Sequence, residues 1–340
     1  MKEYLDYDQK YPDLIVRLVQ FFKNNSKGEK KIWEFCESYI VPKGEDIIQP
    51  IVVGKICDRL WERSILYCIK RGLGLRTNDS FASLGIDQDL YAKYPDVINH
   101  RFNSIVYGFE YIYTHYKDRT IPVVVKSDGD YSMGTCFRIY NGIATARHCL
   151  PEGRLVGIRG YKKSQLQSLN VYVSKNPGID LAFIETKESF IFNEGTPHVL
   201  DNVLVMGYPK VASFLDFCAV EKANISAMAD LRMTPTFGSI AAEGEMYMAK
   251  DLPKLLLVTA KMRGGNSGGP VINEEGYVVG IATGIPDGQG YSDDHVGYGI
   301  AYPIQVLDEM LKEQNKVHID FMDFPFDESA QRNRPLCAHR

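Results

Sequence analysis

KMRGGNSGGPVINEEGYVVGIATG, residues 261–284, sets one serine, Ser267, among four glycines and between two β-rich runs. Small residues allow a substrate carbonyl to approach the backbone closely, and they leave amide N–H groups accessible beside the hydroxyl. Ser267 therefore has the setting of a nucleophile, for which the N–H groups of Gly265 and Ser267 would form an oxyanion hole. The alternative interpretation of the segment is a glycine-rich hairpin loop without chemistry.

The chain around this segment is also β-rich. After Thr120 the sequence consists of short runs separated by Gly, Pro, Asn and Asp, such as IPVVV, LVGIRG, NVYVS, LAFIE, VLVMGYP and GYGIAYPI. Many short strands at this spacing predict a barrel or a sandwich. PIQVLDEMLKEQ (303–314), with Ile304, Leu307 and Leu311 on one face, predicts a closing helix.

A nucleophilic serine requires a base and a group that orients the base, and two segments offer them. GTCFRIYNGIATARHCLP (134–151) has His148 at the end of an apolar strand, and KNPGIDLAFIET (175–186) has Asp180 directly before another. Taken singly, His148 is open to a surface or core role, and Asp180 to a turn role. The rival carboxylates Asp201 and Asp216 lie in less strand-like contexts.

Together, TARHC, GIDLAFI and GGNSGGP, in the order His, Asp, Ser, resemble the three motifs of trypsin-like (chymotrypsin-fold) serine proteases. The resemblance covers residues 121–311. It implies an all-β double β-barrel of two six-stranded barrels with the triad in the cleft between them. It further implies that Ser267 attacks a peptide carbonyl, His148 moves the proton and Asp180 orients the histidine, with an acyl-enzyme formed on a protein or peptide substrate.

Within that family the motifs are most similar to the bacterial HtrA-type branch. Asn266 stands where zymogen-derived members carry aspartate, which argues against activation by clipping a propeptide. The stretch after the protease-like region is too short for a PDZ domain, so we expect none. In secreted relatives the cysteine after the histidine forms a disulfide, for which Cys136 would be the partner of Cys149. A cytoplasmic location favours free thiols at both positions.

The same resemblance suggests residues for the pocket that holds the side chain before the scissile bond. Lys261 would lie near its base, with Thr283 and Gly284 on one wall and Gly299 behind. Lys261 would favour an acidic substrate side chain by ion pairing, or it would turn outward to solvent. His295 is either a second contact for such a side chain or an ordinary loop histidine.

The N-terminal third has a different texture, because from Tyr11 to about Lys117 apolar residues recur at helical spacing. We therefore predict a multi-domain α + β chain with a C-terminal helix after the barrels: a helical adaptor or regulatory domain at 1–117, the protease domain at 118–314, and a tail at 315–340. The residues that carry the helical pattern are Leu14, Leu18, Phe22, Ile56, Leu60, Ile98, Phe102, Ile105, Phe109 and Ile112.

Bulk composition narrows the class of protein. The 340 residues are 45% hydrophobic with a formal net charge of -4 and no long basic run, which argues against a nucleic-acid partner. The charged N-terminus and the lack of a long apolar segment predict a cytoplasmic protein with no membrane association. Neither a metal nor an organic cofactor is called for, because the seven cysteines show no metal-ligand spacing: Cys36, Cys57, Cys68, Cys136, Cys149, Cys218 and Cys337.

Two functions from different classes follow. The first is a serine endopeptidase gated by, or recruited through, its helical domain, which would bind a protein partner or a second copy; similar architectures suggest a role in bacterial defence or stress response. The second is a catalytically silent protein-binding scaffold, against which the complete Ser, His and Asp set counts. An esterase is less consistent with the pattern, because GNSGG lies between β runs and not at a strand-to-helix elbow.

Overall fold

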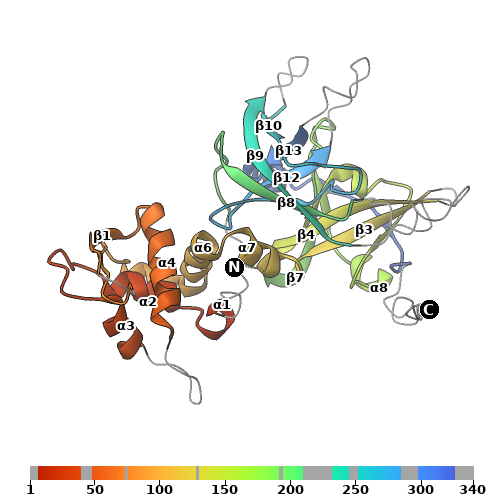
Figure 1. Cartoon of the computed structure of the whole chain (residues 1–340). Helices are drawn as coiled ribbons and strands as arrows, with labels where there is room; N and C mark the ends of the chain where they lie inside the picture. The colour runs from red at the N-terminus through yellow and green to blue at the C-terminus, as the bar shows by residue number, and fades with distance from the viewer. Residues whose placement is uncertain are drawn as a thin grey trace, which may run out of the picture. The chain divides into compact units, whose positions relative to one another are not determined.

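The computed structural model describes residues 7–39, 48–72, 76–127, 130–190, 194–209, 232–244, 252–284 and 298–325. The chain divides into two compact units (Figure 1). The first holds Met1–Ile112 together with the turn Glu274–Gly276, and the second holds Tyr113–Asn273 and Tyr277–Arg340. The predicted multi-domain α + β class is confirmed.

The first unit is mainly helical, as the apolar spacing predicts. Two of its longest helices, α4 and α6, begin with proline, whose missing N–H costs nothing in the first turn, and α6 is followed by Gly108 at φ 70°. The predicted apolar faces of α2 and α4 are fully buried in one core. The described helices are α1 (Tyr7–Lys10), α2 (Leu14–Phe21), α3 (Ile32–Ser38), α4 (Pro50–Glu62), α5 (Gln88–Lys93), α6 (Pro95–Tyr107) and α7 (Phe109–Tyr116).

A short antiparallel hairpin in this unit was not predicted. It pairs β1 (Tyr67–Lys70) with β2 (Ser80–Ala82). The amide of Asn25 holds the hairpin against the helices, because it donates to Ser80 Oγ at 3.0 Å and to the Phe81 carbonyl at 2.9 Å. The Phe81 side chain is fully buried in the helical core, so tertiary packing and not local periodicity defines these strands.

The second unit contains one closed six-stranded barrel, in agreement with the trypsin-like prediction. All its strand pairs are antiparallel, in the order β10-β13-β12-β11-β8-β9. Its interior is filled by apolar side chains such as Val205, Ile240, Leu256 and Val279, which are fully buried. The strands are β8 (Asn202–Gly207), β9 (Thr234–Gly244), β10 (Leu255–Val258), β11 (Pro270–Asn273), β12 (Val278–Gly284) and β13 (Gly299–Pro303).

The other half of the unit differs from a simple six-stranded barrel. It is a seven-stranded sheet in the order β14-β6-β7-β4-β3-β5-β15, so two strands of the C-terminal stretch form its opposite edges. The strands are β3 (Thr120–Ser127), β4 (Asp130–Thr145), β5 (Leu155–Ile158), β6 (Val171–Val173), β7 (Ala182–Phe190), β14 (Lys316–Val317) and β15 (Asp320–Phe321).

The two edge strands bring the ends of this sheet together. Only two residues separate β14 from β15 in sequence, and an extended chain of that length spans at most about 11 Å. Yet β14 pairs with β6 at one edge and β15 pairs with β5 at the other. Residues 316–321, which the sequence analysis assigned to a tail, therefore connect the two edges of the sheet and close it. Residues 326–340 of that predicted tail lie outside the described residues.

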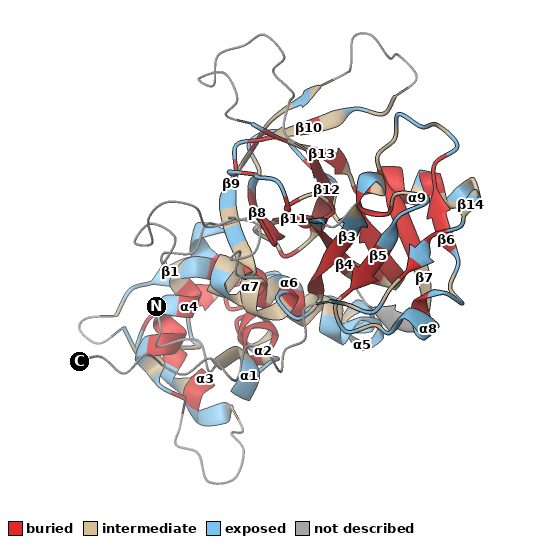
Figure 2. Cartoon of the chain, turned by 90° about the vertical axis from the view of Figure 1, so that its right-hand side faces the viewer, coloured by how far each residue is buried: buried red, intermediate tan, exposed pale blue. Residues whose placement is uncertain are grey.

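Short helices accompany the strands in the described part of this unit. The predicted closing helix is present as α9 (Gln305–Lys312), with Val306, Leu307 and Met310 buried. The others are α8 (Lys163–Leu166) and the 3₁₀ helix η2 (Arg147–Cys149). Buried residues concentrate along the strands of the two sheets (Figure 2). Over the described part of the chain, no helix is both long and apolar enough to cross a membrane.

Candidate active site

His148 lies on η2, at the end of the long strand β4. The turn into η2 is held because the Thr145 hydroxyl donates to the Thr135 carbonyl at 2.7 Å and because Ala146 is fully buried. The imidazole itself stays accessible, with 53% of the His148 side chain exposed. A buried strand end thus presents an exposed base.

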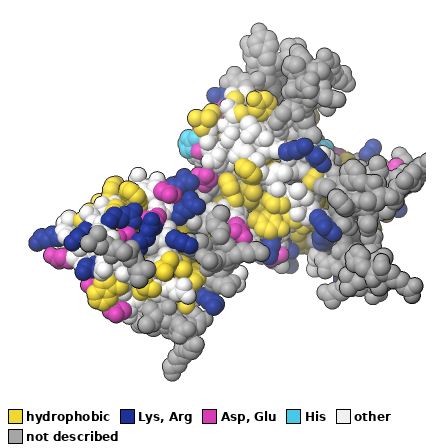
Figure 3. All heavy atoms as spheres, in the orientation of Figure 1, with side chains coloured by type: hydrophobic (Ala, Val, Ile, Leu, Met, Phe, Trp, Pro, Cys, Tyr) yellow, Lys and Arg dark blue, Asp and Glu magenta, His cyan; other side chains and the backbone are white. Residues whose placement is uncertain are grey.

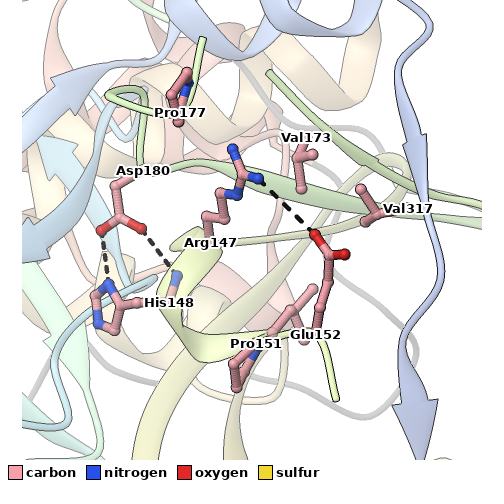
Figure 4. Close-up of a pocket in the computed structure, with 9 residues that line it drawn as sticks. Arg147, His148, Pro151, Glu152, Val173, Pro177, Asp180 and Val317 are labelled. Carbon is pink, nitrogen blue, oxygen red and sulfur yellow. Dashed lines mark hydrogen bonds and ion pairs between the residues drawn. The ribbon is translucent and has the colours of Figure 1, made fainter. Parts of the chain in front are cut away.

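Asp180 binds His148 at two points. Its Oδ2 atom lies 2.6 Å from His148 Nδ1, and its Oδ1 atom accepts the backbone N–H of His148 at 2.9 Å (Figure 4). The pKa of His148 is raised to about 10, first by the hydrogen bond to Asp180 and next by the adjacent Cys149 thiol. When the imidazole is neutral, the carboxylate therefore holds its one proton on Nδ1 and leaves the lone pair on Nε2.

The segment that carries Asp180 is itself anchored. Asn176 Oδ1 accepts the Gly178 N–H at 3.0 Å and closes a turn, and the Tyr302 hydroxyl on β13 donates to the Gly178 carbonyl at 2.9 Å. The Asp180 carbonyl also accepts the backbone N–H of Arg147 at 3.2 Å. The closed barrel, through Tyr302, and the segment after β4, through Arg147, thus jointly hold the Asp180 turn in place.

The Ser267 loop is shaped by glycines whose backbone other residues do not readily adopt. Gly265 has φ 104° and Gly268 has φ 85°. A side chain at Gly265 would collide with the Tyr208 carbonyl, and one at Gly268 with the Thr135 carbonyl and the Thr145 hydroxyl. Three bonds tie the loop to β4 and η2: Thr135 N–H donates to the Ser267 carbonyl at 2.8 Å, Thr135 Oγ1 donates to the Gly265 carbonyl at 2.6 Å, and Cys149 Sγ lies 3.6 Å from the Ser267 carbonyl.

The backbone N–H groups of Gly265 and Ser267 are the two predicted oxyanion donors. Among the hydrogen bonds of the described residues, none uses the N–H of Gly265 or of Ser267 as a donor. Unpaired amides that flank a hydroxyl suit a developing negative charge on a carbonyl oxygen. The structure thus leaves the two predicted oxyanion donors available.

The hydroxyl of Ser267 points to the backbone of β12. Its Oγ donates to the Thr283 carbonyl at 3.1 Å, and no hydrogen bond joins it to His148 among the described side chains. The preceding Asn266 is only 2% exposed, and neither its amide oxygen nor its amide nitrogen has a partner in the described part of the chain. In this conformation the Ser267 hydroxyl is thus hydrogen-bonded to the backbone and not to the imidazole.

The other residues singled out from sequence fall in different places. Lys261 is exposed, so the structure favours the outward alternative over a role at a pocket base. Thr283 is 7% exposed and lies beside Ser267, and Gly284 follows it at the end of β12. The rival carboxylate Asp201 accepts the N–H of His198 away from this site, whereas Asp216 and His295 lie outside the described residues.

Gly299 is closely packed against one neighbour. A side chain at this position would collide with the thioether of Met262, which is 9% exposed. Of the two neighbouring residues Lys261 and Met262, it is therefore Met262 that is buried. Sequence spacing did not single it out.

The cysteines near the site are thiols. Cys136 and Cys149 are both free and buried, in agreement with the preferred interpretation over a disulfide. Burial raises the pKa of the Cys136 thiol well above its usual range, which makes it a poor nucleophile at neutral pH. Over the described residues, no cluster of His, Cys, Asp and Glu has the composition of a metal site.

We expect Gly268→Ala to lower the free energy of unfolding by about 2 kcal/mol or more. The substitution adds left-handed backbone strain of about 1–2 kcal/mol and also the collision with Thr135 and Thr145. Urea denaturation of the full chain measures it. Gly153→Ala is the matched control, because Gly153 has φ 74° but nothing within 4 Å of its added methyl group. An equal loss in both variants would show that the collision does not exist.

The part of the chain that carries this site is similar in sequence to known proteins. Residues 134–281 match the family model described as a trypsin-like peptidase domain. Within the chain, 89 residues are 33% identical to a "Probable periplasmic serine endoprotease DegP-like" of Chlamydia pneumoniae, which corresponds to 24% of this chain and 17% of that protein. A relative of the same description in Chlamydia muridarum is 33% identical over 88 residues. The matched segment thus spans about a sixth of these relatives.

Solved structures of proteases are similar at low identity. "HtrA-type protease AlgW with tripeptide" is 19% identical with a TM-score of 0.43, over 59% of this chain and 62% of that chain. The active form of the Rv3671c protease from M. tuberculosis is 17% identical with a TM-score of 0.43, over 61% of this chain and 85% of that one. The likeness of residues 134–281 to peptidases therefore rests on the sequence match and not on these structures.

Proposed function

We propose that the chain is a serine endopeptidase, with Ser267 as nucleophile, His148 as general base and Asp180 as the residue that orients His148. The match of residues 134–281 to the model of a trypsin-like peptidase domain supports this proposal. The observation that carries the proposal is the His148–Asp180 pair, which two hydrogen bonds join. The N–H groups of Gly265 and Ser267 donate to no acceptor among the described residues. Its substrate is a protein or peptide.

The proposed reaction uses each group once in each half. Ser267 Oγ attacks the peptide carbonyl while its proton passes to His148 Nε2, and the oxyanion binds the N–H groups of Gly265 and Ser267. The C–N bond then breaks as the imidazolium returns the proton to the leaving amine, which leaves an acyl-enzyme. Water, deprotonated by His148, hydrolyses the ester and regenerates the Ser267 hydroxyl.

One rotation precedes this chemistry. Ser267 Oγ has to leave the Thr283 carbonyl, to which it donates at 3.1 Å, and turn toward the imidazole. A hydrogen bond of this kind contributes only about 0.5–1.5 kcal/mol. The free-energy cost of breaking it is therefore small compared with the activation free energy of peptide hydrolysis.

The same observation supports the second candidate, a silent protein-binding scaffold. A serine hydrogen-bonded to a backbone carbonyl, with an unpaired buried Asn266 amide next to it, is what a site without turnover would contain. The two candidates differ in one measurable property. Only the endopeptidase has a serine that reacts covalently.

Labelling of the full chain with a serine-reactive fluorophosphonate, beside Ser267→Ala and His148→Ala, tests the proposal without knowledge of the substrate. We expect label on the wild type alone. A folded wild-type protein that takes up no label would contradict the endopeptidase and favour the scaffold. Label retained by Ser267→Ala would remove Ser267 as the nucleophile.

The helical unit is proposed to recruit a protein partner or a second copy and so to gate the site. Support comes from its independent core and from large apolar side chains on its surface, among them Trp33, Ile51, Trp61 and Leu84. On the face shown in Figure 3, Lys and Arg side chains lie among acidic and apolar ones, which suits a protein partner better than nucleic acid.

A cytoplasmic location and a role in bacterial defence or stress response belong to the same proposal. The location is supported by the free, buried thiols of Cys136 and Cys149, which oxidising compartments tend to pair. The named relatives are described as periplasmic, so fractionation of cells that express the full chain is the deciding experiment.

A further inference from the structure

A pocket of about 310 Å³ opens beside the His148–Asp180 pair (Figure 4). His148 and Asp180 form one side of it, and the apolar side chains of Pro151, Pro177 and Val317 line much of the rest. This volume is at the lower end of the range for ligand pockets, which suits one amino-acid side chain. Because His148 would contact the reacting peptide, an occupant of the pocket lies close to the scissile bond.

The chemistry of the pocket is set by Arg147. Its side chain is 30% exposed and projects into the pocket (Figure 4). A guanidinium has five N–H donors, but among the described residues Arg147 makes only a 3.4 Å hydrogen bond to the Ser174 carbonyl and a 4.0 Å ion pair with Glu152. Both contacts are long for charge-assisted hydrogen bonds, which are usually about 2.7–2.9 Å. Most of the hydrogen-bonding capacity of this cation is therefore unused.

The carboxylate of Glu152 occupies the position next to Arg147 that a carboxylate ligand would take. Its side chain is 62% exposed at the rim, and an ion pair at 4.0 Å between such groups contributes about 0–1 kcal/mol. Glu152 can therefore turn out into water at little cost. Among the described residues, Asp180 makes no ion pair with the Arg147 guanidinium, and both of its carboxylate oxygens accept hydrogen bonds from His148.

We infer that this pocket binds an acidic side chain, Asp or Glu, of the substrate, with its carboxylate replacing that of Glu152 on Arg147. The inference rests on the proposed endopeptidase function and adds its substrate class. A carboxylate is favoured over a cation because the guanidinium lies inside the pocket, whereas the carboxylate of Glu152 lies at the rim and can leave. This preference is distinct from the one expected at Lys261, which is exposed.

The test is cleavage of fluorogenic peptides in which Glu and its neutral isostere Gln are exchanged at each of the three positions on either side of the scissile bond. We expect the wild type to favour Glu by at least about tenfold in kcat/KM at one position, because a charge-assisted hydrogen bond contributes that much. Arg147→Gln should bring this Glu/Gln ratio to within about twofold of one. Glu152→Gln should raise it about two- to fivefold, because the internal competitor is gone.

Arg154→Gln is the matched control. Arg154 is exposed, donates to Ser127 Oγ at 2.8 Å and does not line the pocket, so its removal should leave the Glu/Gln ratio unchanged. A ratio near one at every position in the wild type, or one unaffected by both Arg147→Gln and Glu152→Gln, overturns the inference. If Arg147→Gln does not fold, Glu152→Gln still tests the inference, because Glu152 is at the surface and its substitution should not disturb folding.

Two further results separate this inference from the proposed function and from other carboxylates. Fluorophosphonate labelling with normal cleavage of neutral peptides, but no Glu preference, refutes the pocket assignment alone. Absence of both labelling and cleavage refutes the endopeptidase itself. If the pocket instead serves a free carboxylate, glutarate will inhibit neutral peptides as strongly as Glu-containing ones, and the Glu/Gln ratio will stay near one.

Discussion

Ser267→Ala lowers kcat/KM for peptide hydrolysis on the order of 10⁶-fold if the serine is the nucleophile, because no acyl-enzyme can form. The residual rate over water comes from the amides of Gly265 and Ser267 and from substrate binding, which the substitution leaves in place. Steady-state hydrolysis of a fluorogenic peptide measures the loss. The hydrogen bond to the Thr283 carbonyl is the only described side-chain hydrogen bond that the variant removes, so its folding should be close to that of the wild type.

The control for this experiment is Ser239→Ala. Ser239 lies on β9 and has contacts with Thr259, outside the Ser267 loop, so its removal should leave hydrolysis within about twofold of the wild type. Substantial hydrolysis by Ser267→Ala, in protein free of contaminating protease, would contradict the proposed mechanism.

Asp180→Asn is expected to lower kcat about 10⁴-fold while the protein still folds. An asparagine amide can donate to His148 Nδ1, which forces the proton onto Nε2 and leaves no lone pair there for the Ser267 proton. It also removes the negative charge that stabilises the imidazolium. The 2.6 Å contact between Nδ1 and Oδ2 makes this effect large, because the two groups already lie at full hydrogen-bonding distance.

The role of Asp180 can also be tested by the pH dependence of kcat/KM. The imidazole accepts a proton only when it is neutral, so kcat/KM of the wild type should rise with pH toward the His148 pKa of about 10. Asp180→Asn removes the main cause of that raised pKa, and the residual activity should therefore reach its plateau at a lower pH. Titration of His148 by NMR in both proteins checks the shift without substrate.

Asp201→Asn is the matched control for both measurements. Asp201 also faces a histidine, with its Oδ2 atom 3.5 Å from His198 Nδ1, but that pair lies away from Ser267. Its removal should change neither kcat nor the pH profile. A loss of activity as large as that of Asp180→Asn would mean that the wrong carboxylate has been placed in the site.

The sequence predicted those features whose chemistry restricts the amino acid at one position. Only glycine fits at Gly265 and Gly268, where a side chain would meet backbone atoms, so the GGNSGGP pattern is visible in the sequence itself. His148 ends one apolar run and Asp180 precedes another, and they were singled out only because, with the Ser267 segment, they resemble the trypsin-like motifs. Helical spacing likewise predicted the buried faces of α2 and α4.

What escaped prediction depends on contacts between distant segments. Thr135 ties β4 to the Ser267 loop, and Tyr302 ties β13 to the Asp180 turn, but neither residue stands out from its neighbours in the sequence. The outward direction of Lys261 and the inward direction of Arg147 are likewise set by local packing and not by spacing. The strands β1, β14 and β15 have two to four residues, too few for a period to be recognised.

The edge strands β14 and β15 also determine when, during synthesis of the chain, the seven-stranded sheet can close. Because a ribosome makes the chain from its N-terminus, the segment with His148 and Asp180 emerges long before residues 316–321, which join the two ends of the sheet that carries them. That sheet cannot close until Phe321 has been synthesised. If the proposed peptidase activity requires the closed sheet, newly made chains gain that activity only after Phe321 has been translated.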